Sequence, residues 1–249
     1  MPTSVVVGEP EPAPVKPAAP PAKFANQKRF VVPYKPNEGD AARIIIPVKI
    51  NGGPTVAMAL DTGAPGTLIT FKLAARLGIL REGDGRLVTK AGGIGGTANA
   101  ALVVLDSLSV GEAKSDFVPA TVTELFTDAF EGLVGMDFLA GYSLQIDTDH
   151  HELIFIELPT GPGWPAGHDE TWWRRTFRQV KGQREHWKAL QVSMQERINR
   201  SMSSAGEESD ELKKLLTFCE SQHREAEILE RRLDRYAANH SVPLEWRRP

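Results

Sequence analysis

The stretch ALDTGAPGTLIT, residues 59–70, places an acidic side chain, Asp61, directly after an apolar run and directly before a hydroxyl and a glycine. A carboxylate at this point would stand at the end of a strand, near the core of a sheet. Gly63 allows a tight turn and a close approach by a substrate or a second chain. Thr62 supplies a hydroxyl that can be buried only with a hydrogen-bond partner. The pattern suits a carboxylate that activates water, although Asp61 could also be an ordinary turn residue.

Short β-rich runs, punctuated by Gly, Asn and Asp, lie on both sides of this stretch. They are RIIIPVKI (43–50), TVAMAL (55–60), RLVTK (86–90), NAALVVL (99–105), SLSVG (107–111), DFVPATV (116–122), YSLQID (142–147) and ELIFIEL (152–158). Many short strands at close spacing predict a barrel or a sandwich. We also expect a helix in FKLAARLGIL (71–80), ending near Gly78, and a second short helix after Gly135.

Composition divides the chain into three parts. Residues 1–28 are rich in Pro and Ala, so we expect a disordered or polyproline-like arm. Residues 29–160 hold the predicted strands, and residues 161–249 are highly charged with helical periodicity. In this last part, mostly apolar residues recur in steps of three and four, which is typical of a heptad seam. They are Trp173, Phe177, Val180, Trp187, Met194 and Ile198 before a break at 201–209, and Leu212, Leu215, Cys219, Gln222, Ala226, Leu229, Leu233 and Tyr236 after it. We predict a C-terminal α-helical hairpin.

The bulk composition excludes several classes of protein. A net charge of −3 over 249 residues gives no global field that would favour nucleic acid or anionic lipid. A single cysteine, Cys219, excludes an intramolecular disulfide framework and a multi-cysteine metal site. No apolar stretch approaches the roughly 18 residues needed for a membrane span, and the start lacks an apolar signal region. We expect a cytoplasmic protein, or a periplasmic or membrane-anchored one if the true N-terminus lies upstream.

Two further motifs accompany Asp-Thr-Gly in a recognisable order. GLVGMDFL, residues 132–139, has two apolar residues, a glycine and, two positions on, an aspartate at the start of a predicted helix. KAGGIGGTAN, residues 90–99, is a glycine-rich segment between the two. Over residues 41–158 the chain resembles the retropepsin-like aspartic proteases, in particular the bacterial and cellular branch with a single Asp-Thr-Gly per chain. The resemblance implies a mainly β fold, a closed retropepsin-like barrel, here followed by the helical hairpin.

The resemblance also implies roles for particular residues. The catalytic motif would be Asp61, Thr62 and Gly63, with Thr62 bracing two halves across a two-fold axis and Gly63 lining the cleft. Substrate would be bound by Ala64 and by a flap hairpin containing Gly92, Gly93, Ile94, Gly95 and Gly96. The structural signature would be Leu133, Val134, Gly135 and Asp137.

Catalysis in this family implies a pair of carboxylates that share one proton. One accepts a proton from the attacking water and the other donates to the substrate carbonyl. Because the chain has a single Asp-Thr-Gly, we predict a homodimer that brings together Asp61 from each copy. The expected activity is aspartic endopeptidase cleavage of a protein or peptide bound in extended form, without a metal or cofactor.

The chain departs from the viral members of the family near the expected dimer contact. Those members carry acidic residues after Asp-Thr-Gly-Ala and a basic residue inside the second signature, where this chain has Pro65, Gly66 and Met136. Arg43 stands where the viral enzymes keep an arginine, but its usual ion-pair partner is absent. A viral-style ionic network at the interface is therefore not expected.

Other interpretations remain open at this stage. The same fold could serve as a catalytically inactive protein-interaction or dimerisation module, with the helical hairpin as its functional part. GGIGG (92–96) could suggest a phosphate loop, but no Lys-Ser/Thr follows it. His150 and His151, with Asp147 and Asp149, could suggest a metal, but an exposed hairpin turn fits better. The basic, aromatic segment 172–188 could touch a membrane surface, nucleic acid or a partner helix, but packing within the hairpin is favoured.

Overall fold

Six strands close into a β-barrel. In the computed structural model they follow the order β3-β4-β9-β5-β8-β7, and an additional pairing between β3 and β7 closes the ring. Their bounds are β3 Arg43–Ile50, β4 Thr55–Leu60, β5 Thr67–Thr70, β7 Gly96–Val110, β8 Ala113–Thr123 and β9 Gly132–Val134. The structure describes residues 27–37, 43–93, 96–124, 127–158, 163–201 and 207–248. The predicted closed barrel is confirmed, and the predicted arm at 1–28 lies outside the described residues except for its last two.

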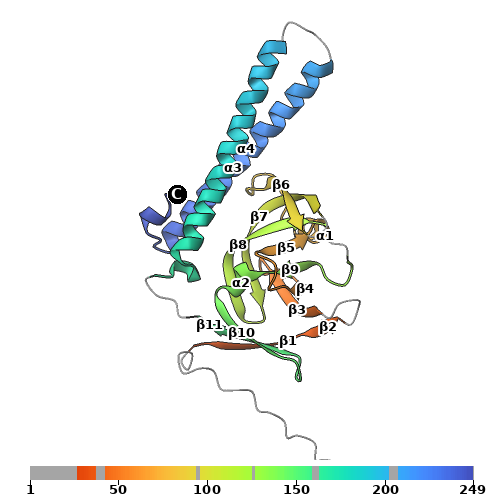
Figure 1. Ribbon diagram of the computed structural model, residues 1–249, viewed down its shortest axis with the longest axis vertical. Helices are drawn as coiled ribbons and strands as arrows, with labels where there is room; N and C mark the ends of the chain where they lie inside the picture. Colours follow the sequence, from red (N-terminus) through yellow and green to blue (C-terminus); the bar gives the residue numbers. More distant parts are fainter. Residues whose placement is uncertain are drawn as a thin grey trace, which may run out of the picture.

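The remaining strands extend and flank the barrel. β2 (Lys35–Asn37) and β6 (Leu87–Gly93) lie at the two ends of the barrel sheet. A separate three-stranded sheet has the order β1-β11-β10, with β1 at Arg29–Pro33, β10 at Tyr142–Asp147 and β11 at Glu152–Glu157. It lies at the end of the barrel away from the free end of the long helices (Figure 1).

Alternation of side chains along the strands fills the barrel. In β3, Ile46, Val48 and Ile50 are at most 1% exposed, whereas Pro47 and Lys49 between them face solvent. This is the period of two expected for a strand with one buried face. Two strands were predicted at 99–105 and 107–111, but the structure has one continuous strand, β7. The strand runs through Asp106, which the register with β8 leaves out, and the Asp106 carboxylate lies 2.9 Å from Arg232 Nη2.

The path of β9 decides where the site forms. β9 pairs in parallel with β4 and antiparallel with β5, so it inserts between two strands that follow one another in the sequence. The 61–66 loop that joins β4 to β5 therefore lies beside the turn that leaves β9. Helix α1 (Phe71–Arg76) follows β5, with the Thr70 hydroxyl accepting the Leu73 amide at 3.1 Å as an N-cap. Helix α2 (Met136–Leu139) follows β9.

Two long helices form the predicted hairpin, α3 at Glu170–Ser201 and α4 at Glu207–Asn239. They lie side by side and their free end projects away from the barrel (Figure 1). Short 3₁₀ turns occur at Pro165–Gly167 and Leu244–Trp246. Within the described residues no helix is both long enough and apolar enough to cross a membrane.

Most of the predicted seam of α4 is buried, and one position is not. Leu212, Cys219, Ala226, Leu229 and Leu233 are at most 6% exposed. The prediction is wrong for Leu215, which is 49% exposed. Near the free end only α3 covers α4, so a residue at the flank of the seam stays uncovered. Closer to the barrel, the seam joins a cluster that also contains barrel residues. Its members from the barrel are Leu87, Val104 and Phe117.

Candidate active site

Asp61 lies at the first position after β4, and the backbone around it is held firmly. Its amide donates to the carbonyl of Val134 in β9 at 3.0 Å, and its carbonyl accepts the amide of Ala64 at 3.2 Å. Its side-chain Oδ1 accepts the Gly63 amide at 2.9 Å. The side chain is half-buried, and Thr62 and Gly63 are exposed. A carboxylate can accept about four hydrogen bonds, so the Asp61 side chain keeps acceptor capacity directed to solvent.

The turn after β9 interlocks with the Asp61 loop. The Met136 amide donates to the Ala64 carbonyl at 2.9 Å. Gly135 allows this contact, because a Cβ at that position would clash with the Gly66 carbonyl oxygen and would lie 2.9 Å from the Ala64 carbonyl oxygen. The structure thus brings Asp61 and Ala64 together with Val134 and Gly135 through the backbone alone.

Asp137 has a different environment from Asp61. Its carboxylate accepts the Thr67 amide at 2.9 Å, the Thr67 hydroxyl at 3.0 Å and the Phe138 amide at 2.8 Å. Burial raises the pKa of Asp137 above its ordinary value, and the bonds from Thr67 and Phe138 oppose that rise. This carboxylate ties helix α2 to the start of β5, which is a structural task rather than a reactive one.

The glycine-rich segment forms a β-hairpin, as the sequence predicts. Strands β6 and β7 pair in antiparallel register, with Gly92 opposite Thr97 and Gly93 opposite Gly96. Ile94 and Gly95 lie outside the described residues. Between described residues, no hydrogen bond joins this hairpin to Asp61, so the single chain does not bring the two parts of the predicted site into direct contact.

Two features of the site could not be read from the motifs. Thr67 holds Asp137 through both its amide and its hydroxyl, although these residues are 70 positions apart. Gly132 is required by packing, since a Cβ there would clash with the Leu68 carbonyl oxygen. The glycine that opens GLVGMDFL was the only sign of this contact.

The guanidinium carbon of Arg43, the residue at the expected dimer contact, lies 5.6 Å from the centre of the Phe130 ring.

His150 of the 148–151 turn pairs with Asp147, just before that turn. His150 Nδ1 lies 2.9 Å from Asp147 Oδ2, and the amides of Asp149 and His150 donate to the other oxygen of Asp147. The arrangement closes the exposed turn between β10 and β11. Across the described part of the chain, no three His, Cys, Asp or Glu side chains come together as metal ligands.

Sequence comparison agrees with the motifs. Residues 46–138 match the sequence model of a family described as aspartyl protease. DNA damage-inducible protein 1 from Kluyveromyces lactis is 28% identical over 135 residues, which cover 54% of this chain and 31% of that protein. Protein DDI1 homolog 2 from Homo sapiens is 28% identical over 116 residues, 47% of this chain and 28% of that protein. The chain thus spans less than a third of the length of these curated relatives.

Two solved structures align with about half of this chain. A retropepsin-like aspartic protease from Rickettsia conorii aligns with 52% of this chain and 91% of its own, at 19% identity and a TM-score of 0.37. The retroviral protease-like domain of Ddi1 from Leishmania major aligns with 48% of this chain and 97% of its own, at 21% identity and a TM-score of 0.33. The family match over residues 46–138 agrees with the ordered motifs, so this part of the chain resembles the aspartyl proteases.

Proposed function

We propose that the chain is an aspartic endopeptidase whose catalytic dyad consists of Asp61 from each of two copies. The observation that carries the proposal is the environment of Asp61. Its carboxylate is anchored by the Gly63 amide at 2.9 Å and retains acceptor capacity on the open side. Asp137, the other aspartate of the motifs, is occupied by three hydrogen bonds, so it is not available as a second catalytic carboxylate.

The mechanism follows from the chemistry of two close carboxylates. When they share one proton, the ionised one accepts a proton from water as the water attacks the peptide carbonyl. The protonated one donates to the carbonyl oxygen. Thr62 would brace the two copies, and Gly63, Ala64 and the β6–β7 hairpin would bind the main chain of an extended peptide. Activity should fall as the pH rises and both carboxylates ionise.

The test is cleavage of a diverse peptide library by the wild type and by Asp61→Asn, from acidic to neutral pH, with the oligomeric state measured by sedimentation at micromolar concentration. Cleavage by the wild-type dimer alone supports the proposal. Equal cleavage by both proteins overturns it. No cleavage by a folded wild-type protein, or a monomer in solution, favours the alternative of an inactive interaction or dimerisation module.

A further inference from the structure

Helix α4 binds the segment that leads into the β6–β7 hairpin. The Glu225 carboxylate accepts three backbone amides of that segment, those of Gly83 at 2.5 Å, Gly85 at 2.7 Å and Arg86 at 3.1 Å. The side chain is 3% exposed. A buried carboxylate is costly unless it is fully hydrogen-bonded, and here backbone donors from a distant loop meet that need.

Gln222, one turn earlier on the same face of α4, binds the strand itself. Its Oε1 accepts the Val88 amide at 2.7 Å, and the side chain is 1% exposed. Among the strands that the structure describes, β6 is the last of its sheet and pairs only with β7. Gln222 therefore supplies a partner on the open edge of β6, where another strand would otherwise be needed.

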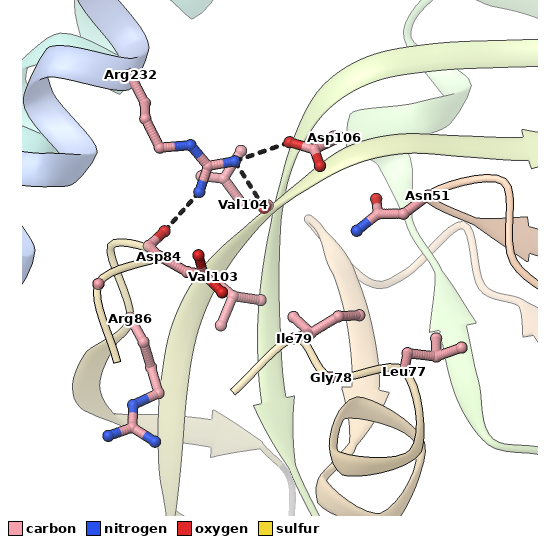
Figure 2. Close-up of a pocket in the computed structure, with 11 residues that line it drawn as sticks. Asn51, Leu77, Gly78, Ile79, Asp84, Arg86, Val103, Val104, Asp106 and Arg232 are labelled. Carbon is pink, nitrogen blue, oxygen red and sulfur yellow. Dashed lines mark hydrogen bonds and ion pairs between the residues drawn. The ribbon is translucent and has the colours of Figure 1, made fainter. Parts of the chain in front are cut away.

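Close packing also joins α4 to the segment that leads into the β6–β7 hairpin. Gly85 has a φ of +81°, and a Cβ there would lie 3.1 Å from the Leu229 side chain. Leu87 is fully buried in one cluster with Leu229 and other residues of the helical hairpin. Arg232, one turn beyond Leu229, donates to the Asp84 carbonyl and to the Asp106 carboxylate at the rim of a pocket of about 380 Å³ (Figure 2).

We propose that α4 is a positioning element for the β6–β7 hairpin, and that Glu225 and Gln222 are the positioning residues. β6 has the barrel on one side and α4 on the other, so the helix sets the orientation in which β6 runs towards Gly93. In its catalytic consequence the inference rests on the proposed function, since it takes the hairpin to bind the peptide. The helical hairpin then contributes to peptide binding without touching the peptide.

Amide hydrogen exchange tests the contact independently of activity. The variants are Glu225→Gln, which keeps the shape and loses one acceptor oxygen, and Gln222→Met, which keeps the length and loses the acceptor. Glu227→Gln is the matched control, because Glu227 lies on the same helix and accepts none of these amides. We expect exchange at Gly83, Gly85, Arg86 and Val88 to become faster on the order of tenfold in the two variants, as for one lost hydrogen bond. Exchange at Thr67, on the far contact with Asp137, should not change.

Unchanged exchange in segment 83–88, or equal acceleration at Thr67, would overturn the proposal. The second outcome would mean that α4 stabilises the whole fold rather than this hairpin. The two variants change separate contacts of α4. If one of them fails to fold, the other still tests the proposal.

Kinetics with a peptide selected from the library test the functional consequence. Glu225→Gln and Gln222→Met should raise KM several-fold, on the order of tenfold at most, and leave kcat within about twofold, because they weaken binding by the hairpin and spare Asp61. A fall in kcat at unchanged KM would indicate only a loss of active protein and would contradict a positioning role. If the wild type cleaves no peptide, the proposed function fails, and the exchange experiment still decides whether α4 holds the hairpin.

Discussion

Two turns meet at the end of β4, and each contains an aspartate. The two carboxylates differ in the number of hydrogen bonds that they accept. In the 61–66 loop, the Asp61 carboxylate accepts one amide and faces solvent. In the turn after β9, the Asp137 carboxylate is half-buried and accepts three donors. A Cβ at Gly135 would clash with the backbone of Gly66 and Ala64 in the other turn, whereas a Cβ at Gly63 would meet only the Asp61 side chain of its own loop. The difference teaches that one turn is tied down through its aspartate, whereas the other leaves its carboxylate with open acceptor positions.

The largest expected effect tests how tightly the turn after β9 packs against the Asp61 loop. Gly135→Ala should destabilise the fold by about 3 kcal/mol, because the new methyl group meets the backbone carbonyls of Gly66 and Ala64, which cannot move aside. Gly63→Ala should cost less than about 1 kcal/mol, since its Cβ would meet only the Asp61 side chain, at 3.2 Å. Urea unfolding of both variants measures the contrast. Equal losses would show that the two turns are equally constrained.

The next largest effect on stability is expected from removing the carboxylates of Asp137 and Asp61 one at a time. Asp137→Ala should cost about 2 kcal/mol or more, because the amides of Thr67 and Phe138 lose their acceptor in a buried place. Asp61→Ala should cost less than about 1 kcal/mol, since water can replace an exposed acceptor. The measurement is again the free energy of unfolding in urea. A more damaging Asp61→Ala would mean that Asp61 is a structural turn residue.

Mixed dimers test whether Asp61 must come from both copies. Wild-type chains refolded with about a tenfold excess of Asp61→Asn chains should lose activity about tenfold, because nearly every wild-type chain then pairs with a variant chain. Refolding with the same excess of Asp137→Asn chains is the control, since those dimers keep both copies of Asp61. Full activity in the presence of excess Asp61→Asn chains would contradict a dyad formed across the dimer.

The smallest effect is a pH dependence of stability. Burial raises the pKa of Asp137 in the folded protein, so its contribution is fully present below the ordinary aspartate pKa and is lost as the pH rises through the raised value. The stability of wild type minus that of Asp137→Asn should therefore decrease from acidic to neutral pH. Asp147 gives a control of opposite sign, because its hydrogen bonds with His150 lower its pKa. For Asp147→Asn the same difference should increase as the pH rises through the ordinary aspartate range, below the pH at which His150 loses its proton, and a matching slope for both variants there would refute the assignment.

Strand positions were largely predictable, and the reasons are local. The runs 43–50, 55–60 and 142–147 are strands β3, β4 and β10 with the predicted bounds, because alternating apolar residues and turn residues act within a few positions. The break predicted after residue 105 was wrong: β7 continues through Asp106, whose carboxylate pairs with Arg232, 126 positions away. Leu215 was placed in the buried seam for a similar reason: periodicity does not tell how far a covering surface extends.

The sequence by itself determined the resemblance of residues 46–138 to the aspartyl proteases and the candidate carboxylate, since Asp-Thr-Gly and GLVGMDFL are short, ordered patterns. Only the tertiary structure decided which donors each aspartate meets. The insertion of β9 between β4 and β5 brings Thr67 to Asp137 and leaves Asp61 open. It also decided that Glu225 and Gln222 serve the β6–β7 hairpin. Hydrogen bonds between residues more than 100 positions apart depend on the whole path of the chain, which no local pattern encodes.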